Sequence, residues 1–161
     1  MKTTGNTILI TGGGTGMGLE AAKQFDAMGN AVIMVARNEE RLKREADKLK
    51  NASIIGCDLS IEGELDRLVE TIKQNHPKLN MAFLNAGMAT NYKLLSRNDS
   101  YNISIQEMVT NYNAVVKLSQ DLSPIITDKE TAAMIITTSG VAFVTLPIAQ
   151  PRLRSIPMYY H

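Results

Sequence analysis

The sequence predicts an α/β protein in which a parallel sheet of about five strands carries helices on both faces. Short apolar runs of strand length alternate with segments whose apolar residues recur at helical spacing. The run at residues 31–36, AVIMVA, is apolar throughout, as expected of a parallel strand that is covered on both faces. A glycine-rich turn separates the first run from the first helical segment. Regular alternation of this kind is typical of a doubly wound sheet.

The first strand–helix–strand unit lies close to the N-terminus. Thr7–Ile10 is a short apolar strand that runs into glycines. A helix is expected from Met17, because apolar residues follow at about helical spacing and Gly29-Asn30 can end the helix. The second strand is the uninterrupted apolar run Ala31–Ala36. The apolar helix positions are Leu19, Ala22, Phe25 and Met28.

The same alternation continues to residue 138. Each further helical segment has apolar residues on one face, and each further strand is short and apolar. In chain order we expect a helix around Leu42, Ala46 and Leu49, a strand at Ser53–Cys57, a helix at Leu65–Ile72, a strand at Met81–Leu84, a helix at Ile105–Leu122 and a strand at Ala132–Thr138.

Two segments show neither a short apolar run of strand length nor apolar residues at helical spacing. Met88–Asn102 is polar and irregular, and is either a loop beside a substrate site or a surface connection. The segment Gln150–His161 contains two prolines and two arginines without helical spacing, so we expect an irregular or disordered tail. The predicted domain therefore covers residues 1–149, and the tail covers residues 150–161.

Composition and charge exclude several classes of partner. The chain has 17 Lys+Arg and 16 Asp+Glu, a net charge of +1, so it has no uniform field to hold nucleic acid or an anionic membrane. The apolar run near the N-terminus is too short for a signal peptide or a membrane span. The lone Cys57 is interpreted as a reduced core thiol, which favours the cytoplasm. His76 and His161 lack the spacing of metal ligands, and no metal site is predicted.

The glycine-rich turn has the sequence TGGGTGMG and lies between a strand and a helix. Glycines let the backbone approach a pyrophosphate closely, and the following helix N-terminus offers unpaired N–H groups and a partial positive charge. The turn therefore predicts a dinucleotide site, although a purely structural glycine turn is the alternative. The candidate residues are Thr11, Gly12, Gly14, Thr15, Gly16, Met17 and Gly18.

Further motifs follow the glycine turn in a fixed order. The glycines have the spacing TGxxxGxG, and the later motifs are Asp58-Leu59, Asn85-Ala86-Gly87, Asn111 and Thr138-Ser139-Gly140. Over residues 5–149 the sequence resembles the short-chain dehydrogenase/reductase family, and its stretch TTSGVAF is similar to the DltE-type oxidoreductases within that family. The resemblance implies a Rossmann-type fold and a nicotinamide cofactor.

The resemblance also implies roles for the strand-end motifs. An aspartate at the position of Asp58 hydrogen-bonds the adenine amino group, with Leu59 beside it. The turn Asn85, Ala86 and Gly87 packs beside the cofactor and steadies the central sheet. The alternatives are that Asp58 is a turn or helix-start carboxylate and that Asn85 is a plain turn residue.

The end of the second strand favours NADP(H) over NAD(H). Members that prefer NAD(H) place an acid there, whereas this chain has Ala36 followed by Arg37. A guanidinium can bind a 2′-phosphate through paired, charge-assisted hydrogen bonds. The alternative is that Arg37 is a solvated side chain engaged by Glu39 or Glu40. Thr15, where some NADP-dependent members carry a base, lends no support.

The resemblance assigns catalytic roles to Ser139 and Asn111. Ser139 takes the place of the serine that polarises the substrate carbonyl, and Asn111 that of the residue that holds a water in the proton relay. The alternatives are a Ser-Gly turn and a helix-surface amide. The family reaction is hydride transfer between the nicotinamide and a small carbonyl or alcohol substrate.

The Tyr-x-x-x-Lys pair of the family is absent from the printed sequence. Arg152 lies where the tyrosine is expected, and the last lysine is Lys129. The pair matters because an unperturbed phenol, with a pKa of about 10, is a poor base at neutral pH. One alternative uses Tyr159 as a displaced acid with Arg154 in place of the lysine. Otherwise we expect a chain truncated relative to the family, lacking the C-terminal part of its fold, and inactive or weak alone.

Other functions remain open from the sequence. The last strand is expected to be an unprotected edge with an exposed apolar flank, a feature that promotes association. The alternatives to an oxidoreductase are a non-catalytic nucleotide-binding or interaction module and a nonproductive, frameshifted fragment. The resemblance also implies a homo-oligomer.

Overall fold

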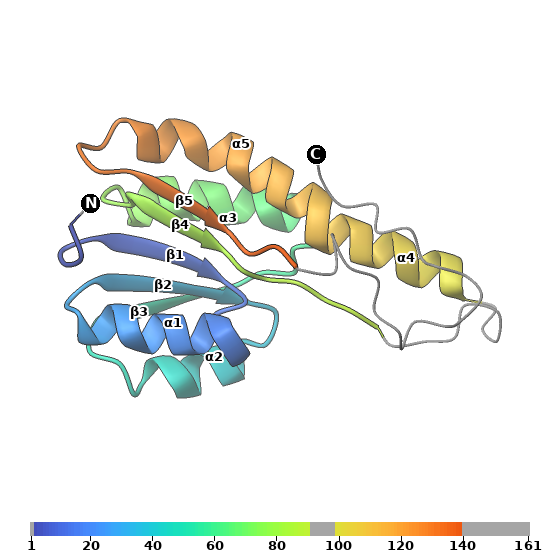
Figure 1. Ribbon diagram of the computed structural model, residues 1–161, viewed down its shortest axis with the longest axis horizontal. Coiled ribbons are helices and arrows are strands. Elements are labelled where there is room, and N and C mark those ends of the chain that lie inside the picture. Colours follow the sequence, from blue (N-terminus) through green and yellow to red (C-terminus); the bar gives the residue numbers. More distant parts are fainter. Residues whose placement is uncertain (1, 91–98, 140–161) are drawn as a thin grey trace.

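The computed structural model describes residues 2–90 and 99–139 of the chain. Strands and helices alternate along these residues (Figure 1). The strands are β1 (Thr7–Thr11), β2 (Ala31–Ala36), β3 (Ala52–Gly56), β4 (Met81–Leu84) and β5 (Ala133–Ile136). The helical elements are α1 (Gly16–Ala27), α2 (Glu39–Ala46), α3 (Glu62–Asn75), α4 (Ser100–Met108), the π-helical turn Val109–Asn113, and α5 (Ala114–Thr127).

The five strands form one parallel sheet in the order β3-β2-β1-β4-β5. Ile8 of β1 lies opposite Val32 of β2 on one side and Met81 of β4 on the other. The chain thus starts in the centre, moves outward to β3 and then crosses to the other half. This topology confirms the predicted doubly wound fold, and it brings the carboxyl ends of all strands to one edge, where such sheets bind ligands.

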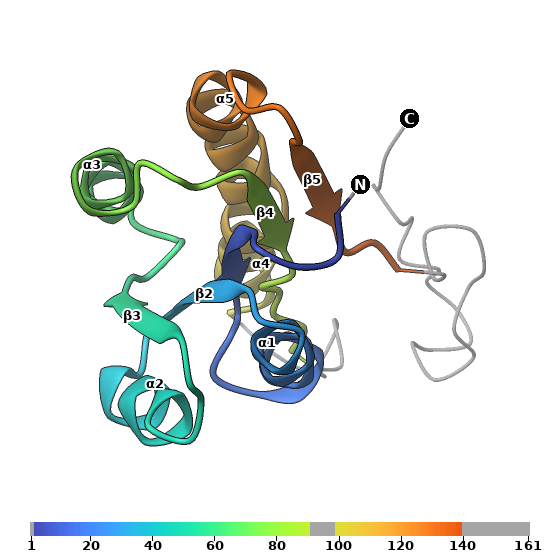
Figure 2. The same cartoon turned by 90° about the vertical axis from the view of Figure 1, so that its left-hand side faces the viewer.

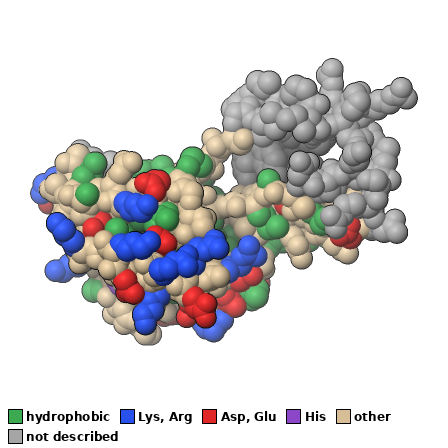
Figure 3. Space-filling model, turned by 90° about the horizontal axis from the view of Figure 1, so that it is seen from below, with side chains coloured by type: hydrophobic (Ala, Val, Ile, Leu, Met, Phe, Trp, Pro, Cys, Tyr) green, Lys and Arg blue, Asp and Glu red, His purple; other side chains and the backbone are tan. Residues whose placement is uncertain are grey.

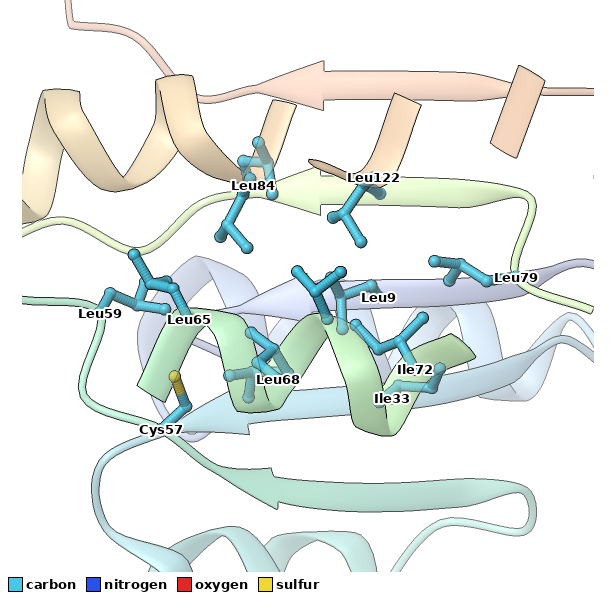
Figure 4. Close-up of a cluster of buried hydrophobic side chains, with 14 of the residues drawn as sticks. Leu9, Ile33, Cys57, Leu59, Leu65, Leu68, Ile72, Leu79, Leu84 and Leu122 are labelled. Atoms are coloured by element: carbon cyan, nitrogen blue, oxygen red, sulfur yellow. The ribbon is translucent and has the colours of Figure 1, made fainter. Parts of the chain in front are cut away.

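Helices cover both faces of the sheet, as Figure 2 shows in an end-on view. Alternate strand residues point to opposite faces. Leu9 and Ile33 belong to the buried cluster on the α3 and α5 side, which Figure 4 shows in close-up. Ile8 and Met34 belong to the cluster on the α1 and α2 side. Two apolar layers therefore hold the central strands in a fixed position.

A buried asparagine network holds the amino ends of the strands together. Asn30 Oδ1 accepts hydrogen bonds from the Asn6 backbone N–H at 2.9 Å and the Asn6 side-chain amide at 3.0 Å. Asn80 donates to Asn6 Oδ1 at 3.0 Å and to the Thr131 carbonyl at 3.1 Å, and it accepts from the Thr7 N–H at 2.9 Å. The residues before β1, β2, β4 and β5 are thereby linked by hydrogen bonds.

The long helical run begins earlier than its apolar pattern indicates. The sequence predicts a helix from Ile105, whereas α4 begins at Ser100 and the run ends at Thr127. Tyr101 is 75% exposed, and Figure 1 shows α4 extending beyond the ends of the strands. A helical segment that projects away from the core needs no apolar stripe, which is why the apolar periodicity did not indicate its first residues. The prediction of irregular structure up to residue 102 is therefore wrong at its end, and residues 91–98 lie outside the described part.

The last described strand is shorter than expected and forms an edge. β5 spans Ala133–Ile136, against the predicted Ala132–Thr138, and among the described residues it pairs with β4 alone. Ile135 and Ile136 are 40% and 45% exposed. These side chains give the described sheet the apolar, exposed edge that the sequence predicts. The predicted tail at 150–161 lies outside the described residues.

None of the helices in the described ranges combines the length and the apolar character that a transmembrane helix requires.

Candidate functional site

The turn between β1 and α1 is shaped by two glycines with positive φ. Gly12 has a φ of +70° and Gly16 a φ of +53°, a region that side chains other than glycine rarely adopt. Thr15 is the N-cap of α1, and its side chain makes no capping hydrogen bond. The N–H groups of the first helical turn have no acceptor within a helix. The turn therefore presents unpaired amides at the positive end of the α1 dipole.

Close contact with the turn after β4 explains two of these glycines. A Cβ on Gly18 would clash with the carbonyl oxygen of Gly12 and lie 2.8 Å from Asn85 Nδ2. A Cβ on Gly12 would lie 3.0 Å from the Cα of Ala86. The glycine turn and the Asn85-Ala86-Gly87 turn are thus packed backbone to backbone, which any larger residue at Gly18 would prevent.

Thr11 joins the same two turns from inside the protein. Its side chain is buried, and Oγ1 accepts hydrogen bonds from the backbone N–H groups of Asn85 and Ala86, both at 3.0 Å. Asn85 Oδ1 accepts in turn from Thr137 Oγ1 at 3.1 Å. Hydrogen bonds therefore link the carboxyl ends of β1, β4 and β5. Thr11 and Asn85 support the site from behind and do not line its cavity.

A cavity of about 180 Å³ opens at this edge of the sheet, between the ends of the strands. It brings together residues from four separate sequence motifs. The sequence-predicted residues that line it are Gly12, Thr15, Arg37, Asp58, Leu59, Ala86 and Gly87. Gly14, Gly16, Met17 and Gly18 belong to the adjoining turn and the first turn of α1, outside this lining.

Asp58 lies on the cavity wall with each carboxylate oxygen in a different environment. Oδ1 accepts hydrogen bonds from the Ser60 N–H at 2.9 Å and the Ser60 hydroxyl at 2.7 Å. Oδ2 lies 4.0 Å from Nη1 of Arg37. Burial raises the pKa of Asp58, but the Ser60 hydrogen bonds and the Arg37 charge outweigh it, so the pKa lies below its ordinary value. Asp58 is therefore an anion at neutral pH.

Arg37 reaches the cavity from the end of β2. Its ion pair within the described residues is to Asp58, not to Glu39 or Glu40 as the sequence-based alternative proposed. The Arg37 side chain is 69% exposed, so the pair is open to solvent and weak. Arg37 can therefore turn toward an anionic ligand without a large loss of stability.

Asn111 lies in the π-helical turn and fastens the loop after β4. Its Oδ1 accepts from the Met88 N–H at 2.8 Å, and its Nδ2 donates to the Met88 carbonyl at 2.7 Å. One helical turn earlier, Glu107 Oε1 accepts from the Thr90 N–H at 2.6 Å. These contacts contradict the alternative of a helix-surface amide. Asn111 does not itself line the cavity, although its neighbour Thr110 does.

Ser139 follows β5 at the same edge of the sheet. It is exposed and lies outside the residues that line the cavity. Ser139 thus lies at the strand-end edge of the sheet but not in the cavity wall, and Gly140, the next residue of its motif, lies outside the described residues.

Five residues of the cavity wall were not among the predicted site residues. They are Val35, Ala36, Cys57, Met88 and Thr110. The first three lie at or next to the carboxyl ends of β2 and β3, so the rule that ligands bind at strand ends could have found them. Met88 and Thr110 could not be found this way, because they meet only through the packing of a loop against a helix.

Burial makes Cys57 an unreactive part of this wall. The thiol is 2% exposed and free of any disulfide. Burial, assisted by Glu64 and Asp58, raises its pKa to about 12. The predicted position of this thiol in the core is confirmed. Within the described residues, no group of three His, Cys, Asp or Glu side chains could hold a metal ion.

Comparison with known proteins gives one family. A family model described as short chain dehydrogenase matches residues 6–151. An uncharacterized oxidoreductase, DltE of Bacillus subtilis, is 34% identical over 148 residues, which cover 92% of this chain and 59% of that protein. A fatty acyl-CoA reductase of Mycobacterium tuberculosis is 32% identical over 125 residues, covering 75% of this chain and 42% of that protein. The chain therefore spans about half the length of these relatives.

Solved structures show the same fold. The L-sorbose reductase of Gluconobacter frateurii, complexed with NADPH and L-sorbose, aligns with a TM-score of 0.81 at 25% identity, covering 91% of this chain and 58% of that one. A short chain dehydrogenase of Shigella flexneri complexed with NADP aligns with a TM-score of 0.75 at 28% identity, covering 86% and 61%.

Proposed function

The chain belongs to the short chain dehydrogenase family, and from this membership we propose that it binds NADP(H), in preference to NAD(H), at the carboxyl edge of its sheet. One observation carries the proposal: the unpaired amides at the start of α1 adjoin the cavity that Gly12, Thr15 and Arg37 line. An anion bound there gains both hydrogen bonds and the favourable field of the helix dipole.

The proposed pose follows the chemistry of the cavity wall. The pyrophosphate lies on the N–H groups of Gly16 and Met17. The adenine lies toward Asp58 and Leu59, where the carboxylate can accept from the exocyclic amine. The nicotinamide end lies toward Gly87, where the missing side chain leaves room for a ribose.

The preference for NADP(H) rests on the end of β2. Ala36 offers no carboxylate to the ribose diol, and Arg37 adds a cation at the cavity. A guanidinium binds a phosphate through two parallel hydrogen bonds. Both solved relatives named above were crystallised with the phosphorylated coenzyme, which supports the proposal.

Hydride transfer is the chemistry that a bound nicotinamide would supply. The proposed substrate is a small carbonyl or alcohol compound, with Ser139 donating a hydrogen bond to its oxygen and Asn111 holding the loop that borders the cavity. The 161 residues contain no Tyr-x-x-x-Lys pair. We therefore expect this chain, purified alone, to bind the coenzyme without measurable turnover.

Calorimetric titration of the purified chain with NADP⁺ and NAD⁺ tests the proposal. We expect the wild-type chain to bind NADP⁺ at least about tenfold more tightly, the ratio that about 1.4 kcal/mol provides. Arg37→Ala should remove most of this difference. Lys73→Ala is the control, because Lys73 pairs with Glu70 on the surface of α3 and does not line the cavity. Equal affinity of the wild-type chain for both coenzymes contradicts the preference.

A second candidate is a nucleotide-binding interaction module without catalysis. The exposure of Ile135 and Ile136 along the edge of β5 favours it, because exposed apolar edges promote association. Coenzyme binding without turnover is expected of the purified chain under both candidates, so the distinguishing outcome for this module is a defined association through the β5 edge, measured by analytical ultracentrifugation and lost in Ile135→Lys. Carbonyl-dependent oxidation of NADPH would exclude it.

A further inference from the structure

The side chain of Arg41 lies against the glycine turn, although Arg41 belongs to α2 and to none of the motifs. A Cβ placed on Gly14 would lie 3.9 Å from Cδ of Arg41, 3.7 Å from Cβ of Ala36 and 3.5 Å from Cδ2 of Leu42. The arginine stem is therefore in contact range of the turn, one residue before Thr15. Arg41 does not line the cavity itself, but its stem lies beside Gly14, between the cavity residues Gly12 and Thr15 in sequence.

Local structure fixes this position of Arg41. Asn38 caps α2, with its Oδ1 accepting from the Arg41 N–H at 2.8 Å and its carbonyl accepting from the Leu42 N–H at 3.0 Å. Leu42 is fully buried in the cluster beneath α1 and α2. The cap and the buried leucine together hold the first turn of α2, so the Arg41 backbone cannot move far from the glycine turn.

The charge of Arg41 is not balanced by a neighbouring acid. Figure 3 shows basic and acidic side chains intermixed on the face that carries α1 and α2. Arg44, also on α2, has its Nε 3.4 Å from Oε1 of Glu45. Arg37 has its Nη1 4.0 Å from Oδ2 of Asp58. For Arg41, no acidic side chain of the described residues comes within 4.0 Å. Glu39 is directed elsewhere, since its carboxylate occupies the space beside Gly56.

On the basis of the proposed function, we propose that Arg41 is a second binding residue for the 2′-phosphate of NADP(H). The phosphate is a dianion, and Arg37 alone is partly compensated by Asp58. Arg41 adds a second arginine from α2, whose stem lies against Gly14 of a turn that carries no charged side chain. A guanidinium on each of two elements favours the phosphorylated ribose over the plain diol.

Paired ligands that differ by one phosphate test this role. Calorimetric titrations compare adenosine 2′,5′-bisphosphate with 5′-AMP, and NADP⁺ with NAD⁺, for the wild-type chain, Arg41→Ala and Arg41→Lys. We expect Arg41→Ala to weaken both 2′-phosphorylated ligands about tenfold and to change 5′-AMP and NAD⁺ less than about twofold. Arg41→Lys should recover part of the loss, because it keeps the charge but not the paired donors.

The control is Arg44→Ala, which removes an arginine of the same helix that already pairs with Glu45. Thermal unfolding of each variant shows whether it folds. An unchanged affinity of folded Arg41→Ala for adenosine 2′,5′-bisphosphate, with a loss in Arg37→Ala, overturns the role of Arg41 and leaves the proposed function standing. An equal loss for 5′-AMP and its 2′-phosphorylated form also overturns it. A wild-type chain that binds none of the four ligands overturns both proposals.

Discussion

The side chain of Asn111 and the backbone of Met88 form a closed pair of hydrogen bonds. The amide oxygen accepts from the Met88 N–H and the amide nitrogen donates to the Met88 carbonyl, at 2.8 and 2.7 Å. Asn111 lies in the π-helical turn between α4 and α5, and Met88 lines the cavity. π-Helical turns often occur at functional sites. Here the turn carries the amide that fixes one wall of the cavity.

Replacing Asn111 should loosen this wall without unfolding the sheet. Asn111→Ala leaves the Met88 N–H and carbonyl without their partner, and we expect the free energy of unfolding to fall by about 1–3 kcal/mol. Urea unfolding measures the loss, and NADP⁺ titration should show weaker binding. Asn113→Ala, on the same π-helical turn but exposed, is the control and should change neither quantity. Equal effects of the two variants would show that the hydrogen bonds between Asn111 and Met88 contribute neither to stability nor to coenzyme binding.

Gly18 should tolerate no side chain. A Cβ there meets the Gly12 carbonyl oxygen and Asn85 Nδ2, both parts of the packed turns. Gly18→Ala should lower the free energy of unfolding by about 3 kcal/mol and weaken coenzyme binding, because overpacking displaces the glycine turn. Gly63→Ala is the matched control, since a Cβ on Gly63 of α3 meets nothing within 4 Å. That variant should be as stable as the wild type or more stable by up to about 1 kcal/mol. A Gly18→Ala protein of wild-type stability would contradict the packing seen here.

The hydroxyl of Thr11 should matter more than its methyl group. Thr11→Val keeps the shape but leaves the N–H groups of Asn85 and Ala86 without an acceptor, and each such group costs about 1–3 kcal/mol when buried. We expect a loss of about 2 kcal/mol or more in the free energy of unfolding from urea titration. Thr11→Ser keeps the acceptor and should lose less. A larger loss in the serine variant would assign the contribution of Thr11 to apolar packing.

Much of the sheet could be predicted from sequence because its central strands are buried on both faces. The strands Ala31–Ala36 and Met81–Leu84 have the predicted bounds. An uninterrupted apolar run marks both ends of a buried parallel strand, because polar residues begin where the strand leaves the core. β3 is displaced by one residue from its prediction, to Ala52–Gly56. The apolar pattern continues to Cys57, which is buried but lies past the strand.

Other features depend on contacts between distant residues and could not be predicted. The asparagines Asn6, Asn30 and Asn80 resemble ordinary turn residues in sequence, yet they are 4%, 0% and 9% exposed and bond to one another. The pairing of Arg37 with Asp58 rather than Glu39 is likewise a contact between residues that are distant in sequence. Helix spacing indicates which charges are near in sequence, but the β2–β3 register decides which strand ends meet.

Cys57 should react slowly with alkylating reagents for as long as the protein stays folded. Burial raises its pKa from 9.0 to about 12, so the folded thiol keeps its proton over a range in which the unfolded thiol loses it. The unfolded state then binds fewer protons, and the free energy of unfolding should fall as the pH rises above 9.

The difference between wild type and Cys57→Ala isolates this effect from other groups that titrate at high pH. Urea unfolding of both proteins at pH 8, 9 and 10 should show the wild type losing its advantage progressively above pH 9, while the difference stays constant below it. Iodoacetamide should modify the unfolded wild type much faster than the folded protein at pH 8, because the thiolate is the reactive form. NADP⁺ should slow the folded reaction further, since Cys57 lines the cavity. If iodoacetamide modified the folded protein about as fast as the unfolded protein, the cavity wall around Cys57 would open readily. The proposed coenzyme site would then lack a rigid wall at this position.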